Sequence, residues 1–328
     1  METLTLADFD AAAAEFDAAV VATPGIDHFC SSSAWVLPAA EALMPARDPW
    51  LFRSEAGFAA CMHNDAFGSV EPLELAWGLA CPLVGHDLER LCAGFAAECL
   101  FRRGAWRYLA LSGVPMHGEV CRAVVRHFGP SFPVRVGAST VRHVASLEGG
   151  VDGFLGRRSR NLRKGLRQAL RAAVAAGIGF ESVRVGDVAA ADALYARILA
   201  VEERSWKARE GHGIAAGPMC EFYRRMIRRL AVDGRQRTLF GRHEGRDVSY
   251  ILGGVLGQRY RGLQFSYDAD HEAFGLGGLG QYHQVIELVA EGVTQYDLGT
   301  DMDYKRRWAE QVEETVMLVV DNRAGFGG

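Results

Sequence analysis

Long apolar runs are missing from this sequence of 328 residues. No stretch approaches the roughly 20 consecutive apolar residues that a membrane-spanning helix requires. The N-terminal segment METLTLADFD is acidic, whereas a secretory signal begins with a basic region. We therefore expect no transmembrane helix, no cleaved signal and a cytoplasmic location.

Disulfide and metal-binding patterns are missing as well. Seven cysteines are spread along the chain without a C-x-x-C pair and without a histidine at zinc spacing. In a reducing compartment such cysteines behave as small buried hydrophobic residues. We expect neither a disulfide nor a structural metal.

Lysine is absent from the first 150 residues, which carry 10 arginines and 17 acidic residues, a net charge of −7. The remainder of the chain carries +3, so the whole chain has a net charge of −4. The length and this asymmetry predict two domains, joined near the glycines of LEGGV at residues 147–151. We place the first domain at residues 1–148 and the second at residues 149–328.

Hydrophobic periodicity predicts a similar order of elements in both halves. In the first half we predict strands within residues 49–64, 73–85 and 107–113, and helices at 86–104 and 117–129. In the second half we predict a strand at 179–186, helices at 187–207 and 217–234, strands at 236–245, 246–257 and 259–268, a helix at 280–292, and strands at 294–299 and 314–322. Antiparallel strands followed by a strand, helix and strand predict an α/β fold, with a mixed, largely antiparallel sheet and flanking helices.

A basic segment follows the expected domain junction. The run RRSRNLRKGLRQALRAA, residues 157–173, holds seven cations and no acid. It predicts a helix with an apolar row at Leu162, Leu166, Leu170 and Val174. The other face would carry a cationic stripe, which consists of Arg160, Lys164, Arg167 and Arg171. Two interpretations stay open, a solvated helix face and a surface that binds phosphate groups.

The acidic stretch QYDLGTDMDYKRRWAEQ, residues 295–311, contains Asp297, Asp301 and Asp303. Oxygen ligands at alternating positions suit calcium, but a calcium loop also needs a glycine at its sixth position and a glutamate at its twelfth. Tyr304 and Lys305 stand where such a loop would turn. The spacing therefore excludes a dedicated calcium loop.

The segment AFGLGGLGQYHQVIEL contains a glycine motif, because Gly275, Gly277 and Gly280 match G-x-G-x-x-G. Asp297 follows about twenty residues later, as in a dinucleotide-binding fold. However, ADHEAF separates the preceding strand from Gly275, and too little chain follows for a doubly wound sheet. A purely structural turn is another interpretation. Bare backbone N–H groups and a helix that begins near Gly278 would also suit an anion, above all a pyrophosphate.

These segments together resemble the GNAT superfamily of N-acyltransferases. They most resemble its tandem branch, with FemAB-type aminoacyltransferases and acetyltransferases associated with cellulose biosynthesis. The resemblance covers roughly residues 150 to 320 well and the first half only by element order. A Y/F-D-x-G…Y-K ending is matched by Tyr296, Asp297, Gly299, Tyr304 and Lys305, and an sWK motif is matched by Trp206 and Lys207. The superfamily's Q/R-x-x-G-x-G/A loop is matched less well, because Ala273 precedes Gly275 and no Arg or Gln leads the motif.

The resemblance implies two tandem GNAT-like domains with one acyl-CoA site, in the second domain. It places the donor against Phe265, Ser266, Tyr267, Gly275, Gly277, Gly278, Leu279 and Gly280, where two strands would diverge to admit a thioester. The first domain has no glycine loop and would wall the acceptor cleft between the domains.

The same resemblance implies roles for residues near the motif. Catalytic candidates are Lys305, Tyr304, Asp301, Asp303 and Asp268, and acceptor contacts are Trp206, Lys207, Asp297 and His271. Tyr304 would protonate the leaving thiolate, Lys305 would hold a phosphate or the oxyanion, and an aspartate would receive the proton of the amine.

The expected function is N-acyl transfer from acyl-CoA to an amine of a small molecule or peptide. An aminoacyl-tRNA donor is the alternative enzymatic interpretation, and a degenerate non-catalytic scaffold is a third. We expect no DNA partner, and the acidic first domain would repel the body of an RNA.

Overall fold

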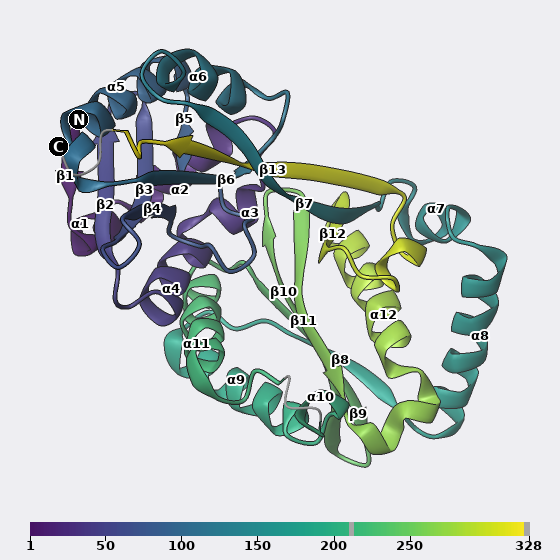
Figure 1. The fold of residues 1–328 in the computed structure, drawn as a ribbon. Coiled ribbons are helices and arrows are strands. Elements are labelled where there is room, and N and C mark those ends of the chain that lie inside the picture. Colours follow the sequence, from purple (N-terminus) through teal and green to yellow (C-terminus); the bar gives the residue numbers. More distant parts are fainter. Residues whose placement is uncertain (210–212, 325–328) are drawn as a thin grey trace. The chain divides into compact units, whose positions relative to one another are not determined.

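The computed structural model describes residues 1–209 and 213–324, without the side chains of Trp206 and Arg209. Contacts divide the chain into two compact units (Figure 1). Unit 1 comprises Met1–Val141 with the C-terminal residues from Glu314 onward, and unit 2 comprises Arg142–Glu313. Within the described ranges, every helix is too short or too polar to cross a membrane.

Unit 1 contains a mixed sheet with helices packed on it (Figure 1). Its strands are β1 (Glu2–Leu4), β2 (Asp48–Ser54), β3 (Gly57–Asn64), β4 (Ser69–Pro72), β5 (Leu83–Gly85), β6 (Tyr108–Val114), the first part of β7 (Val134–Ser146) and most of β13 (Gln311–Asp321). Its helices are α1 (Leu6–Ala11), α2 (Ala13–Ala22), α3 (His28–Ser31), α4 (Ser33–Leu43), α5 (Leu88–Phe101) and α6 (Glu119–Phe128). The strand order is β1-β2-β3-β4-β6-β13-β7. β4 and β6 pair in parallel, whereas the pairs β1-β2, β2-β3, β3-β4 and β6-β13 are antiparallel.

The predicted strand over residues 73–85 is wrong except at its end, where β5 forms. Most of this segment is a loop that wraps around the buried carboxylate of Glu74, which accepts the backbone N–H groups of Trp77 at 2.6 Å and Leu79 at 3.1 Å. Burial raises the pKa of Glu74, and these hydrogen bonds oppose the rise. Backbone groups bonded to a side chain are not available to a ladder, so the apolar residues here fill the core without forming a strand.

The strands of unit 2 are residues 142–146 of β7, β8 (Gly179–Val183), β9 (Gln236–His243), β10 (Arg246–Leu256), β11 (Arg259–Tyr267) and β12 (Gln295–Thr300). Their order is β7-β12-β11-β10-β9-β8. Its helices are α7 (Gly150–Gly156), α8 (Arg160–Ala175), α9 (Val188–Glu202), α10 (Trp206–Arg209), α11 (Gly217–Val232) and α12 (Leu276–Ala290). Short 3-10 turns, η2 (Ala269–Phe274) and η3 (Lys305–Arg307), follow β11 and β12. Helices α9 to α11 lie on one side of the sheet, and α12 with α8 lies on the other (Figure 1). The prediction of an α/β fold with mixed, largely antiparallel sheets is confirmed.

Helix α8 forms where the basic segment predicts it, but its buried face differs from the predicted row. Leu166 and Ala173 are buried, whereas Val174 is 68% exposed. A row with a strict four-residue spacing drifts around a helix of 3.6 residues per turn, so its last member leaves the packed face. Arg160, Lys164, Arg167 and Arg171 are all exposed, as predicted.

Candidate functional site

Strands β11 and β12 pair for only a short distance and then separate. Their parallel pairing runs from Arg259 opposite Gln295 to Arg261 opposite Asp297, although β11 continues to Tyr267 and β12 to Thr300. Beyond Arg261 the edge of β11 that faces β12 therefore has no strand partner there. Such an edge offers backbone N–H and C=O groups to a ligand.

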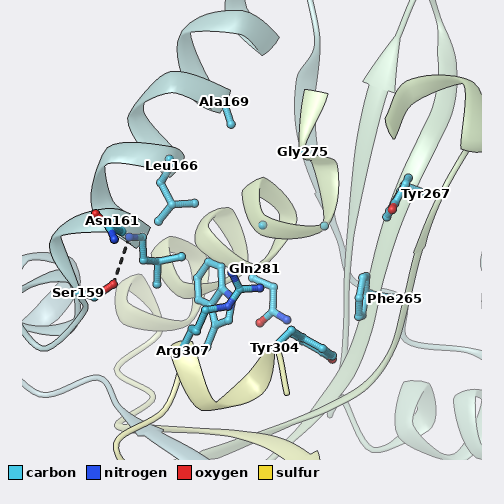
Figure 2. Close-up of a pocket in the computed structure, with 15 residues that line it drawn as sticks. Ser159, Asn161, Leu166, Ala169, Phe265, Tyr267, Gly275, Gln281, Tyr304 and Arg307 are labelled. Atoms are coloured by element: carbon cyan, nitrogen blue, oxygen red, sulfur yellow. Dashed lines mark hydrogen bonds between the residues drawn. The ribbon is translucent and has the colours of Figure 1, made fainter. Parts of the chain in front are cut away.

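A cavity of about 550 Å³ lies beside this edge (Figure 2). It is lined by Ser159, Asn161, Leu162, Gly165, Leu166 and Ala169 of α8 and its cap, by Phe265 and Tyr267 of β11, by Gly275, Gly277, Gly278 and Gln281 of α12 and its cap, and by Tyr304, Arg307 and Trp308. Its walls are mainly apolar, with a few polar groups directed inward, as in most small-molecule sites.

The N-terminus of α12 forms one wall of the cavity. Gly275 caps the helix in the left-handed region, with φ 65°, a conformation that favours glycine. The helix begins at Leu276, earlier than both predicted starts, near Gly278 and at residue 280, so Gly277 and Gly278 lie in its first turn. A Cβ at Gly278 would point between Leu166 and Trp308, 3.8 Å from each. The first N–H groups of a helix lack intrahelical acceptors and carry the positive end of its dipole, so this wall suits an anion.

Arg307 lines the same cavity and has no ion-pair partner within the described ranges. In Figure 2 its side chain extends from η3 toward Gln281. A guanidinium binds phosphate oxygens through up to two parallel hydrogen bonds. Sequence reasoning singled out the neighbouring Lys305 but not Arg307, because the sequence does not say which side chain of the YKRRW turn faces the helix.

Tyr304 is the predicted catalytic residue whose side chain lines the cavity. Its ring lies edge-on to that of Phe265, with 5.7 Å between the ring centroids. Burial raises the pKa of Tyr304 to about 12. The hydroxyl is therefore protonated at neutral pH, and it is a weaker acid than that of an exposed tyrosine.

Lys305 is not part of the cavity lining, and the residue is only 7% exposed. Its Nζ donates a hydrogen bond of 2.7 Å to the carbonyl oxygen of Thr300. Burial lowers the pKa of Lys305 from 10.5 to about 8, with a smaller contribution from Arg261, while Asp297 and Asp301 act in the opposite direction.

The three aspartates of the acidic stretch have different surroundings. Asp297 is 1% exposed and pairs with Arg142 and, at 2.7 Å, with Arg261. Asp301 accepts hydrogen bonds from Arg306 and His143, which lower its pKa to about 2. Asp303 is fully exposed, and its nearest cation is Arg306 at 3.8 Å. None of the three lines the cavity.

Asp268 and His271 lie at the far end of β11, outside the cavity lining. Asp268 is buried and accepts a hydrogen bond of 2.9 Å from Arg204. Burial opposes ionisation of this carboxyl group, but the bond from Arg204 prevails and its pKa is lowered. His271 is 3.0 Å from His243, measured between ring nitrogens.

Lys207 reaches the edge of β11 from α10. Its Nζ donates hydrogen bonds to the carbonyl oxygen of Phe265 at 2.5 Å and to the side chain of Gln264 at 3.0 Å. Burial lowers the pKa of Lys207, and Glu202 opposes the shift. The side chain of Trp206, the other residue of the predicted sWK motif, lies outside the described residues.

The remaining predicted donor contacts separate into two groups. Phe265, Tyr267, Gly275, Gly277 and Gly278 line the cavity. Ser266, Leu279 and Gly280 are buried elsewhere. Alternation along a strand turns Ser266 to the opposite face from Phe265. The helical repeat turns Leu279 and Gly280 toward the sheet, where a Cβ on Gly280 would meet Ile251 at 3.3 Å.

The wall formed by α8 was not assigned from the sequence. Its cavity-facing residues include Leu162 and Leu166. The apolar row of the basic helix is therefore the sequence feature that could have indicated this wall. The row does not say what it covers, because an apolar stripe packs equally well on a core or on a ligand.

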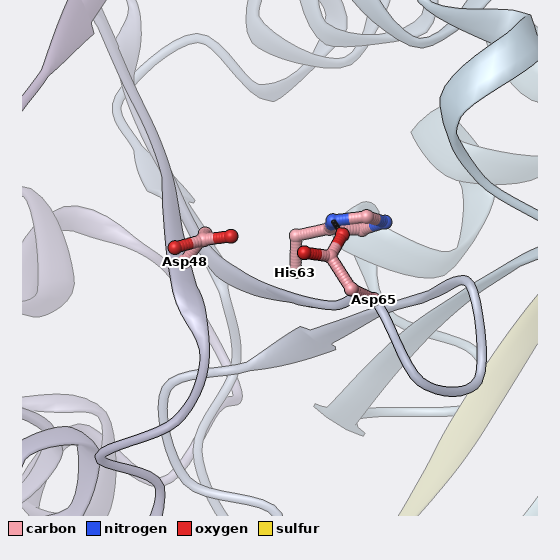
Figure 3. Close-up of side chains that lie close together, drawn as sticks. All are labelled: Asp48, His63 and Asp65. Atoms are coloured by element: carbon pink, nitrogen blue, oxygen red, sulfur yellow. Dashed lines mark ion pairs between the residues drawn. The ribbon is translucent and has the colours of Figure 1, made fainter.

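A second group of polar side chains lies in unit 1, at Asp48, His63 and Asp65 (Figure 3). One ligand atom from each falls within 4.8 Å of the others, and the Nδ1 atom of His63 is 2.9 Å from Asp65. Both carboxylates are exposed, and such groups commonly pair in solvent without a metal. We assign no function to this cluster.

Comparisons with known proteins agree with this geometry. Residues 160–306 match the model of the acetyltransferase (GNAT) domain. No curated protein matches the chain. Among solved structures, a conserved protein of unknown function from Bacteroides thetaiotaomicron superposes with a TM-score of 0.64 and 11% identity, covering 98% of this chain and 99% of its own.

Two further structures share the fold. FemX superposes with a TM-score of 0.63 and 13% identity over 96% of this chain and 97% of its own. L-PGS from Bacillus licheniformis superposes with a TM-score of 0.55 and 10% identity, covering 94% of this chain and 91% of its own. Residues 160–306 are therefore similar to a GNAT acetyltransferase domain, and the chain as a whole has the fold found in FemX.

Proposed function

We propose that this protein transfers an acyl group from acyl-CoA to an amine of a small molecule or peptide. The observation that carries the proposal is the cavity, which combines the N-terminus of α12 with Arg307 and adjoins the edge of β11 beyond Arg261. In the described part of the chain, Arg307 has no ion-pair partner and this edge has no strand partner. A pyrophosphate suits the first two features, and a thioester suits the third.

The chain's own residues would bind the donor in two regions. The N–H groups around Gly277 and Gly278, together with Arg307, would hold the phosphates. The apolar wall of Leu166, Phe265 and Trp308 would cover the donor's arm and exclude water from it. A single dipole interaction contributes only about 0.3 to 1 kcal/mol, so several groups must act together.

In the reaction the neutral amine nitrogen attacks the thioester carbon and gives up one proton to water, and the carbon–sulfur bond breaks. The leaving sulfur takes a proton from an acid of the site, which regains one from water. We propose Tyr304 as the proton donor, because its hydroxyl is protonated and its side chain lines the cavity. Positioning of the two reactants contributes most of the remaining catalysis, about 7 to 11 kcal/mol for well-aligned groups.

The charged residues beside the cavity have supporting roles in this proposal. Lys305 would hold the turn that presents Tyr304, through its bond to the Thr300 carbonyl. Lys207 would contact the acceptor, since its ammonium reaches the edge of β11 at Phe265. Asp301, with a pKa of about 2, is a weak base, so we assign it to holding His143 and Arg306.

Calorimetric titration with acetyl-CoA and free CoA tests the proposal directly. Both should bind the wild type, and Gly278→Asp should abolish binding because its carboxylate enters the anion site. Gly156→Asp is the matched control, since it adds the same charge to unit 2 where nothing lies within 4 Å of the new Cβ. No heat of binding with the wild type, or equal affinity in Gly278→Asp, would refute the acyl-CoA donor.

A further inference from the structure

Gln281 is a polar side chain in a mainly apolar cavity. It is 4% exposed, it lines the cavity, and its Oε1 atom has no hydrogen-bond partner within the described ranges. In Figure 2 its carboxamide lies between Arg307 and Tyr304. Neither the sequence nor the family match assigns it a role.

An unpartnered amide oxygen in a buried site is unfavourable. Leaving a buried acceptor without a partner costs about 1–3 kcal/mol, so most buried polar atoms in native proteins are paired. The oxygen and nitrogen of a carboxamide are assigned from their hydrogen bonds, so the side chain can present either of the two atoms to a ligand. The side chain is therefore poised for a polar group of a ligand.

The position of Gln281 on α12 indicates which part of a ligand it meets. It lies four residues beyond Gly277 and three beyond Gly278, so all three share one face of the helix. At 1.5 Å per residue, Gln281 is about 6 Å deeper than Gly277. A ligand with its phosphates at the helix N-terminus would place the atoms of its arm here.

We propose that Gln281 recognises the arm of the donor, by accepting a hydrogen bond from a hydroxyl or secondary amide N–H in a pantetheine-type chain. This inference rests on the proposed acyl-CoA donor and adds a specificity determinant to it. A pantetheine arm carries such donors on an otherwise apolar chain, close to its pyrophosphate. A nucleoside diphosphate without the arm satisfies the helix N-terminus and Arg307 but leaves Gln281 unpartnered.

The test compares two ligands and two variants by calorimetry. CoA carries the arm, and ADP carries the pyrophosphate without it. Gln281→Met keeps the length of the side chain and removes its amide, so it should weaken CoA about tenfold, which corresponds to about 1.4 kcal/mol. ADP should bind the wild type and this variant equally.

Gln284→Met is the matched control. Gln284 is on the same helix, is 2% exposed and also has an unpartnered Oε1 within the described ranges, but it does not line the cavity. Both substitutions remove an unpartnered buried oxygen, so both should raise the melting temperature, by roughly 2–4 °C per kcal/mol gained. Only Gln281→Met should change the affinity for CoA.

Three results would overturn the inference. Equal CoA affinity in wild type and Gln281→Met would show that the amide meets no part of the arm. A proportional loss of ADP affinity would place Gln281 at the phosphates instead. Absence of CoA binding by the wild type would refute the proposed donor and this inference with it, so the two failures are distinguishable.

Discussion

At position 278 the stability of helix α12 favours alanine, whereas room for a ligand in the cavity favours the glycine that is present. A glycine inside a helix costs roughly 0.5–1 kcal/mol relative to alanine, and a Cβ at this position meets no atom closer than 3.8 Å. We expect Gly278→Ala to raise the free energy of unfolding by up to about 1 kcal/mol and to weaken CoA binding about tenfold, because the methyl group enters the cavity. Urea denaturation and calorimetry measure the two effects separately.

Gly277 provides the comparison for this prediction. A Cβ at Gly277 would stand 3.2 Å from the ring of Phe265, which is tighter than ordinary contact. Gly277→Ala should therefore gain less stability than Gly278→Ala. If Gly278→Ala binds CoA as tightly as the wild type, the cavity does not hold the donor.

Tyr304 carries the proposed proton transfer. Its pKa of about 12 keeps the hydroxyl protonated, and the phenylalanine ring would preserve the contact with Phe265. We expect Tyr304→Phe to lower kcat by about a hundredfold while the affinity for CoA stays within twofold. Tyr282→Phe, on α12 outside the cavity lining, is the control for a lost hydroxyl. Wild-type turnover in Tyr304→Phe would rule out its role as the acid.

The lowered pKa of Lys305 predicts how the stability of the native state depends on pH. Its folded pKa of about 8 lies below its ordinary value of 10.5, so the unfolded state binds the proton more tightly between these limits. The native state therefore gains stability as pH rises through this window. Below about pH 8, burial of the charged Lys305 lowers the free energy of unfolding by its full amount. A shift of this size corresponds to about 3 kcal/mol at ~1.36 per pKa unit.

Lys305→Met should remove this pH dependence. We expect the wild type to gain about 3 kcal/mol relative to the variant between about pH 7 and 10.5, measured by urea denaturation at both values. Lys164→Met, on the exposed face of α8, should follow the wild type. Parallel stability curves for wild type and Lys305→Met would mean that Lys305 titrates as an exposed lysine.

At the scale of elements, helix α8 presents one face to the cavity and another to solvent. Its cavity-lining residues include Asn161, Leu162 and Leu166, whereas the cationic stripe points away from them and has no ion-pair partner within the described residues. We therefore interpret the cationic stripe as a solvated helix face that does not contact the donor.

Replacing the stripe should leave the donor site unchanged. The variant with glutamine at Arg160, Lys164, Arg167 and Arg171 should bind CoA within about twofold of the wild type, because these four side chains are exposed, are not part of the cavity lining and are screened by salt. Calorimetry at about 0.1 M salt measures this. A loss of tenfold or more would show that the stripe contributes to the phosphate site after all.

At the scale of the whole chain, charge distinguishes the two donors considered from the sequence. The net charge is −4, and within the described part of the cavity lining Arg307 supplies the cation without a partner. A polynucleotide donor needs several phosphate contacts, each worth about 0.7 to 0.9 log units of affinity per tenfold change in salt. One or two contacts with acyl-CoA predict a much weaker dependence.

We expect the dissociation constant of acyl-CoA to rise by less than about twentyfold between about 50 and 300 mM salt, and tRNA not to compete with it. Calorimetry at the two salt concentrations and an electrophoretic shift with tRNA measure both. A tRNA complex that survives the higher salt, together with no response to acyl-CoA, would support the aminoacyl-tRNA donor instead.

Most elements of unit 2 could be predicted from the sequence, because they are long and periodic. The strands from β8 to β12 and the helices α8, α9, α11 and α12 all form within or close to the predicted ranges. In unit 1 the helices before residue 44 and the strand β7 were not predicted. The segment of α1 to α4 is nearly uniformly apolar or small, so neither period stands out, and β7 is exposed along much of its length.

The candidate site was only partly predictable for a related reason. The glycines at the start of α12 and Tyr304 carry local signals, namely a bare backbone and a motif position, and both are found in the cavity lining. Arg307 and Gln281 carry no such signal, since an arginine in a basic run and a glutamine in a helix are ordinary residues. Their burial or isolation becomes visible only when other elements pack around them.

The sequence by itself determined the class of fold and the similarity to GNAT acetyltransferases, and it predicted an anion site at the α12 N-terminus, because these depend on local periodicity and on motifs within short stretches. Only the tertiary structure decided which side chains face the cavity. It turned Lys305 inward to Thr300 and left Arg307 beside Gln281. It also separated β11 from β12, since strand pairing is set by contacts between residues far apart in the chain.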